Sequence, residues 1–193
     1  MSDQPQVASQ PRTLGLGEWA VAGLALLVVG FFTLSPTSFP LGKLDAVGYA
    51  VCHRLPEHSF FMGGQQLPMC ARCTGTFLGV FVTLTTLILA GRSRASRMPP
   101  VPVLAVLMSF VLLWGIDGLN SFLSFYPNAP HLYEPQNWLR LTTGALNGLT
   151  MGTLVFGILN FSLWRAPRPT PVLRGWGELA GLVMLTGLAV GLV

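Results

Sequence analysis

The sequence predicts an all-α fold, a polytopic bundle of five transmembrane helices with a short outer amphipathic or re-entrant helix. Of its 193 residues, 51% are hydrophobic and only 9% are charged, whereas soluble globular proteins carry about 25% charged residues. Five apolar stretches approach the roughly 20 residues that a helix needs to cross the hydrocarbon core. This composition excludes intrinsic disorder, and three cysteines are too few for a disulfide-rich secreted scaffold.

The five predicted spans cover about residues 18–34, 68–91, 101–125, 138–164 and 175–193. With their connections they form a single transmembrane domain over residues 14–193, after a polar tail, 1–13, that is predicted to be disordered. The first span is too long and too uniformly apolar for a cleaved signal peptide, so we expect an uncleaved anchor. Between the first two spans, apolar residues at helical spacing from Leu41 to Val51 predict the outer helix.

Arginines in the connecting loops predict the orientation in the cell membrane. The loop after the second span contains Arg92, Arg94 and Arg97, the loop after the fourth contains three more arginines, and neither contains an acid. By the positive-inside rule, these loops and the N-terminus are cytoplasmic, and residues 39–67 are extracytoplasmic. The arginines also contribute to the net charge of +4. Since they form no basic stripe interleaved with aromatic residues, nucleic acid is not an expected partner, whereas the lipid bilayer is.

All three cysteines lie in or beside the extracytoplasmic segment. Cys52 is followed directly by His53, and Cys70 and Cys73 form a C-x-x-C pair at the start of the second span. The pair is predicted to lie on one face of the first helical turns, near the positive end of the helix dipole. That position lowers a thiol pKa, and a neighbouring Arg72 would add to the effect.

Three interpretations of the cysteines stay open. In the first, a turn at Gly63-Gly64 brings Cys52 toward the pair, and the three thiolates bind zinc or another soft transition metal with His53 or His58 as a further ligand. Because adjacent ligands strain a tetrahedral site, the alternative role of His53 is to hydrogen-bond a ligand rather than the metal. In the second, the pair cycles between dithiol and disulfide in a membrane thiol oxidoreductase linked to a quinone or thioredoxin. In the third, a disulfide only clamps the outer segment, and the protein is an accessory subunit or a small-solute transporter.

A group of polar residues is predicted inside the membrane on the same side. Asp117 in the third span and Arg140 in the fourth have opposite charges at similar depth, which favours a direct pair. Ionisable groups within a span are functional candidates because an unpaired charge there is costly. If the protein is an enzyme, Asp117 is the candidate base, and Arg140 would bind an anion beside the metal. Asn120, Thr143 and Asn147 lie within one or two turns, and the asparagines are expected to bond between helices.

Glycines four residues apart occur in three of the spans. Such rows let helix backbones approach closely in lipid, so we expect packing within the chain, with a homo-oligomer as the alternative. The glycines concerned are Gly75 and Gly79, then Gly144, Gly148 and Gly152, and finally Gly177 with Gly181 and Gly187 with Gly191.

A specific pattern of residues extends over about 45–155. It consists of Tyr49, Cys52-His53-Arg54, Pro56, Ser59-Phe60, Gly64, Pro68, Cys70-Ala71-Arg72-Cys73-Thr74-Gly75, Gly79, Asp117-Gly118, Asn120, Leu139-Arg140 and Thr143-Gly144. This pattern resembles the small predicted membrane proteins grouped as domain of unknown function 2085, apart from His53-Arg54, where His-Gln would be expected. The resemblance implies a multi-pass membrane location and a Cys/His site, and it brings no activity with it.

Overall fold

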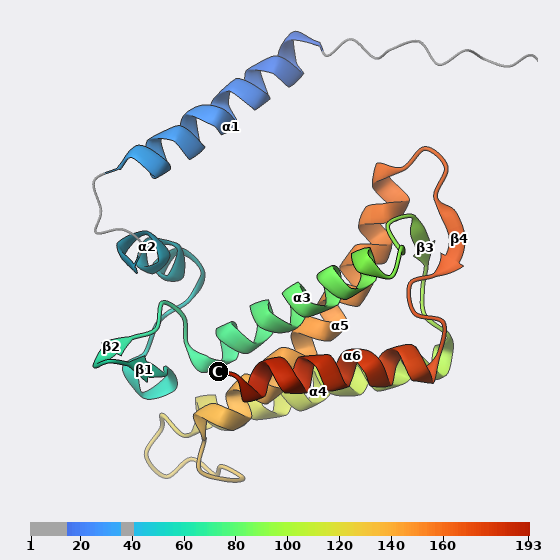
Figure 1. The fold of residues 1–193 in the computed structure, drawn as a ribbon. Coiled ribbons are helices and arrows are strands. Elements are labelled where there is room, and N and C mark those ends of the chain that lie inside the picture. The colour runs from blue at the N-terminus through green and yellow to red at the C-terminus, as the bar shows by residue number, and fades with distance from the viewer. Residues whose placement is uncertain (1–14, 36–40) are drawn as a thin grey trace, which may run out of the picture. The chain divides into compact units, whose positions relative to one another are not determined.

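The computed structural model describes residues 15–35 and 41–193, so the predicted tail of residues 1–13 lies outside the described part. Its helices are α1 (Leu16–Leu34), α2 (Leu41–Val51), α3 (Ala71–Leu89), α4 (Val101–Leu123), α5 (Asn137–Leu163) and α6 (Trp176–Gly191) (Figure 1). A 3₁₀ turn, η1 (Pro56–His58), and the strands β1 (Phe61–Met62), β2 (Gln65–Gln66), β3 (Ala95–Arg97) and β4 (Arg168–Pro171) complete the described elements. The described residues divide into two units between Lys43 and Leu44.

Three of the five predicted spans form helices that are long and apolar enough to cross a membrane, namely α3, α4 and α5. The apolar stretch Trp19–Leu34 of α1 and the whole of α6 are shorter than 18 residues. At 1.5 Å per residue, the 16 residues of α6 extend about 24 Å, less than the hydrocarbon thickness of about 30 Å. The structure therefore supports a helical fold with three candidate spans, and the count of five remains a prediction.

Glycines bring α3 and α5 into direct backbone contact. An added Cβ at Gly75 or Gly79 would lie 2.1 Å from a backbone oxygen of α5. At Gly144 and Gly148 it would lie 2.4 Å and 2.1 Å from backbone oxygens of α3. The prediction that these glycines pack within the chain is confirmed. On α6, in contrast, an added Cβ would meet nothing within 4 Å at any of its glycines, Gly177, Gly181, Gly187 and Gly191.

The hydrophobic core and the largest group of buried polar residues lie toward opposite ends of the α3–α6 bundle, although Arg92 and Asn160 are also buried at the apolar end. The hydrophobic core includes Leu87, Leu107, Leu149 and Leu182, toward the end where β3 pairs with β4. Buried polar side chains gather at the other end, where α3 and α5 begin and α4 finishes. The candidate site is built at this polar end.

The segment before α3 folds as the sequence indicates. Helix α2 lies where the amphipathic pattern predicts the outer helix, and a hairpin of β1 and β2 follows it. The hairpin turn uses Gly63 and Gly64 with φ of +57° and +79°, a left-handed conformation that glycine adopts without steric cost. This turn sends the chain back toward the start of α3.

Candidate metal centre

The three cysteine sulfurs gather at the start of α3. The Sγ atoms of Cys52, Cys70 and Cys73 all lie within 4.8 Å of one another. All three cysteines are free thiols. Sulfurs that share a tetrahedral zinc at about 2.3 Å are roughly 3.8 Å apart. The predicted return of Cys52 to the C-x-x-C pair is thus confirmed, and the cluster is close to the size that one metal ion requires.

Backbone N–H groups at the helix start point toward this cluster. Cys70 is the N-cap of α3, one residue before the first turn in which the sequence placed it. Its N–H donates to Cys52 Sγ at 3.3 Å. Hydrogen bonds from the thiol and the backbone N–H of Cys73 hold the pKa of the Cys70 thiol below its usual range, although burial opposes this shift. The first N–H groups of a helix lack partners within it, and here sulfur accepts from some of them.

His53 lies outside the group of three sulfurs. Its side chain is exposed, and its ring packs edge-on against His58 with 6.2 Å between centroids. The His58 ring also lies 5.2 Å from that of Phe125. Burial, and secondarily the positive charge of Arg140, lower the pKa of His58 to about 4, so its imidazole is neutral at pH 7. The structure therefore supplies three of the four predicted metal ligands as one cluster.

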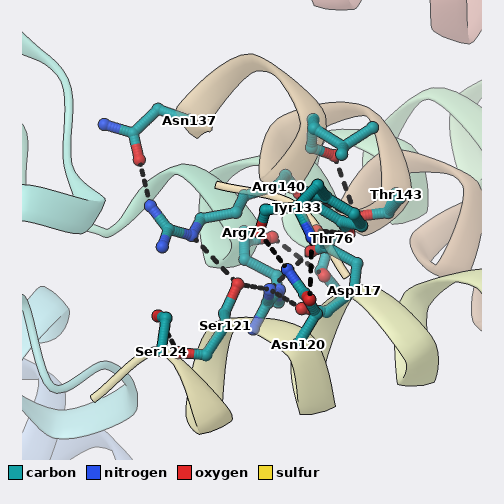
Figure 2. A network of polar contacts seen from close by, with 11 residues as sticks. Arg72, Thr76, Asp117, Asn120, Ser121, Ser124, Tyr133, Asn137, Arg140 and Thr143 are labelled. Carbon is teal, nitrogen blue, oxygen red and sulfur yellow. Dashed lines mark hydrogen bonds and ion pairs between the residues drawn. The ribbon is translucent and has the colours of Figure 1, made fainter. Parts of the chain in front are cut away.

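Arg72 forms an ion pair with Asp117 rather than a contact with the thiols. Its Nη2 donates to Asp117 Oδ2 at 2.5 Å, to the Asp117 carbonyl oxygen at 3.1 Å and to Ser121 Oγ at 3.0 Å (Figure 2). Each residue advances about 100° around a helix, so Arg72 faces a different side of α3 from the two cysteines that flank it. The expected partner of Asp117, Arg140, is not the arginine that the described structure pairs with it.

The Asp117 carboxylate is buried and hydrogen-bonded at both oxygens. Only 2% of the residue is exposed. Oδ1 accepts from the Tyr133 hydroxyl at 2.7 Å, and Oδ2 accepts from Thr143 Oγ1 at 3.2 Å besides Arg72. Burial, followed by the bond to the carboxylate, raises the pKa of Tyr133 to about 12. Sequence reasoning missed Tyr133, because nothing in the spacing of a loop residue indicates a contact with a buried carboxylate.

Arg140 contacts the polar network around Asp117, which includes Arg72, Ser121, Tyr133 and Thr143, through partners other than Asp117. Its Nη1 donates to Asn137 Oδ1 at 2.8 Å, and its Nε donates to Ser121 Oγ at 3.4 Å. Only 4% of Arg140 is exposed. Ser121 therefore lies between the two guanidinium groups of Arg72 and Arg140, and it is a further residue that sequence reasoning missed.

The two asparagines differ from each other in their contacts. Asn120 holds the loop after α4, because its Nδ2 donates to the Tyr133 carbonyl at 2.9 Å and its Oδ1 accepts from Leu132 N–H at 2.6 Å. This contact replaces the expected bond between helices. Asn147 is buried, and its Oδ1 has no partner among the described residues.

The fold and the site together define a helical membrane protein with a three-thiol cluster at one end of its bundle. The chain belongs to the family described as predicted membrane protein (DUF2085), which matches residues 52–154. That range contains all three cysteines together with Asp117 and Arg140.

Two archaeal proteins are similar to this chain. An uncharacterized protein of Methanothermobacter thermautotrophicus is 30% identical over 104 residues, which cover 54% of this chain and 83% of that protein. An uncharacterized protein of Methanocaldococcus jannaschii is 30% identical over 116 residues, which cover 60% of this chain and 66% of that protein. No solved structure matches the chain.

Proposed function

We propose that Cys52, Cys70 and Cys73 bind one zinc ion, or another soft transition metal, at the extracytoplasmic face of the membrane. The observation that carries this proposal is the approach of three free sulfurs to within 4.8 Å of one another. Thiolates are preferred ligands of zinc and of other soft metals. Three protein ligands leave a fourth position for water or for a substrate group, as in catalytic rather than structural zinc sites.

The polar network is assigned a positioning role in this proposal. Arg72 lies between Cys70 and Cys73, and its ion pair with Asp117 holds the first turn of α3 against α4. Because both Asp117 oxygens are occupied by donors, we assign the carboxylate to orient the turn that carries the ligands. A metal with an open position can activate water or polarise a carbonyl or phosphoryl oxygen.

Metal analysis of the purified protein tests the proposal. We expect about one equivalent of metal per chain in detergent, because one tetrahedral ion uses all three sulfurs. Changing Cys52, Cys70 or Cys73 to Ser should remove the metal, whereas Met69→Leu, a volume-conserving change beside Cys70, should retain it. The His53→Ala variant tests whether His53 is the fourth ligand. Loss of the metal identifies His53 as a ligand, and retention of the metal excludes it.

A second candidate function, thiol–disulfide exchange, is favoured by the position of Cys70. Its lowered pKa at the start of α3 is typical of an attacking thiolate, and Cys73 lies beside it. In this reaction Cys70 attacks a substrate disulfide and releases one substrate thiolate. Cys73 then attacks the mixed disulfide, so that the substrate becomes a dithiol and the pair becomes a disulfide.

Counting thiols separates the two functions. Three thiols that titrate after chelation, without any reductant, support the metal site. One thiol before and three after reduction indicate a disulfide, because a Cys70–Cys73 disulfide hides two of them. Turnover of that disulfide with a quinone or a thioredoxin then supports exchange, whereas a disulfide without turnover is a structural clamp.

A further inference from the structure

A polar hollow of about 230 Å³ opens beside the network, at the end of the bundle where α4 finishes and α5 begins. We call it the outer hollow, and its polar lining comes from Glu57, His58, Ser124, Glu134 and Arg140. It contains none of the three cysteines, so it is a separate feature from the metal centre.

The floor of the outer hollow carries a buried positive charge. Arg140 is 4% exposed and forms no ion pair with any acid in the described part of the chain, since Asp117 is paired with Arg72. Two of its nitrogens donate to Asn137 and Ser121, as Figure 2 shows, and Nη2 has no hydrogen-bond partner in the described residues. A guanidinium with a spare N–H group is well suited to a carboxylate or phosphate oxygen.

The rim of the hollow carries the opposite charge. Glu57 is exposed and has no ion pair or hydrogen bond through its side chain within residues 41–193. Glu134 lies on the rim as well, with one oxygen 3.1 Å from His131 Nε2. Two carboxylates at the entrance repel a simple anion and attract a cation. The charges thus favour a ligand with an anionic group at one end and a cationic group at the other.

We propose that the outer hollow binds a zwitterion, with its phosphate or carboxylate at Arg140 and its ammonium group between Glu57 and Glu134. Phosphoethanolamine has this chemistry, both as a soluble compound and as the headgroup of a phospholipid. The neutral ring of His58 and the Ser124 side chain complete the polar wall. This inference goes beyond the proposed metal site and does not require a bound metal.

Calorimetry with the full chain in phospholipid-free detergent tests the charge pattern. We expect phosphoethanolamine to bind about tenfold more tightly than inorganic phosphate or ethanolamine, because each of these engages only one end of the hollow. Glu57→Gln should weaken the binding of phosphoethanolamine about fivefold, because loss of a rim charge costs about 1 kcal/mol, and should not weaken the binding of phosphate. Arg140→Gln should abolish binding of both, and Arg140→Lys should restore part of it if the variant is folded.

Matched controls separate this site from general surface charge and from the metal centre. Asp45→Asn removes a carboxylate of α2 that pairs with Arg54 outside the hollow, and it should leave both affinities unchanged. Cys73→Ser should lose the metal and keep phosphoethanolamine binding. The proposal is overturned if phosphate binds as tightly as phosphoethanolamine, or if Glu57→Gln and Asp45→Asn have equal effects.

Nanodiscs distinguish the two sources of the ligand. In discs made from equal parts of phosphatidylethanolamine and phosphatidylglycerol, native mass spectrometry of the released protein counts the retained lipids. Enrichment of phosphatidylethanolamine that Glu57→Gln removes identifies a lipid headgroup. Binding of free phosphoethanolamine without such enrichment identifies a soluble ligand. Absence of both overturns the proposal.

Discussion

The guanidinium of Arg72 donates to the buried carboxylate of Asp117 at 2.5 Å and thereby joins the first turn of α3 to the C-terminal part of α4. Arg72 lies between Cys70 and Cys73 in the sequence, so this ion pair involves the same turn of α3 that carries two of the proposed metal ligands. A buried ion pair of this kind adds little net stability over an apolar pair, but loss of one partner leaves the other charge buried without a counter-charge. Its structural role is therefore best measured by breaking it.

Breaking the ion pair on one side should destabilise the protein. We expect Asp117→Asn or Arg72→Gln alone to cost about 3–5 kcal/mol, because each leaves a buried group without its opposite charge. The double variant should cost less than the sum of the two single changes. Thermal unfolding in detergent measures the loss of stability in each variant. As a control, Asp45→Asn breaks the ion pair with Arg54, in which the Asp45 side chain is 41% exposed, and should cost at most about 1 kcal/mol. Additive single effects would contradict the coupling.

The backbone contact between α3 and α5 predicts a sharp difference between glycines. In Gly148→Ala the new Cβ would lie 2.1 Å from the Thr76 oxygen, so the helices must separate. Gly187→Ala on α6 meets nothing within 4 Å and, because alanine favours helix by up to about 1 kcal/mol, should be neutral or stabilising. Unfolding temperatures in detergent compare the two variants. Equal temperatures would show that the contact does not limit helix packing.

The sequence predicted features that depend on local patterns and missed those that depend on how helices face each other. The cysteine cluster was predictable because the C-x-x-C spacing and the Gly63-Gly64 turn are local. The partner of Asp117 was not predictable from the sequence, because both Arg72 and Arg140 lie at a depth in the bundle similar to that of Asp117. Which of the two arginines faces Asp117 depends on the rotation of α3 about its axis. That rotation is imposed by the glycine contacts with α5. Tyr133 was missed because loop geometry, which carries no periodic signal, brings its hydroxyl to Asp117.

The hydroxyl of Tyr133 predicts a change in stability at alkaline pH. Its pKa is raised by burial and by the Asp117 carboxylate to about 12, from an ordinary value of about 10. The folded state thus retains this proton when the unfolded chain releases it. The stabilisation is complete below about pH 10 and is lost as the pH rises through about 12.

Phenolate absorbance checks this prediction. The wild-type titration should contain a component near pH 12 that Tyr133→Phe removes. Tyr126→Phe, another tyrosine of the same loop, should leave that component in place. If the component survives in Tyr133→Phe, the hydroxyl does not donate to Asp117 in the folded protein.

The proposed orientation predicts which loops a reagent can reach from outside the cell. Leu132 is 79% exposed in the loop between α4 and α5, and Ser93 is exposed in the arginine loop after α3. In a background with the three native cysteines changed to Ser, Leu132→Cys should react with a membrane-impermeant maleimide in intact cells. Ser93→Cys should react only after the cells are permeabilised, because arginine-rich loops stay cytoplasmic. The reverse labelling would place the cysteine cluster on the cytoplasmic side and exclude an extracytoplasmic metal centre.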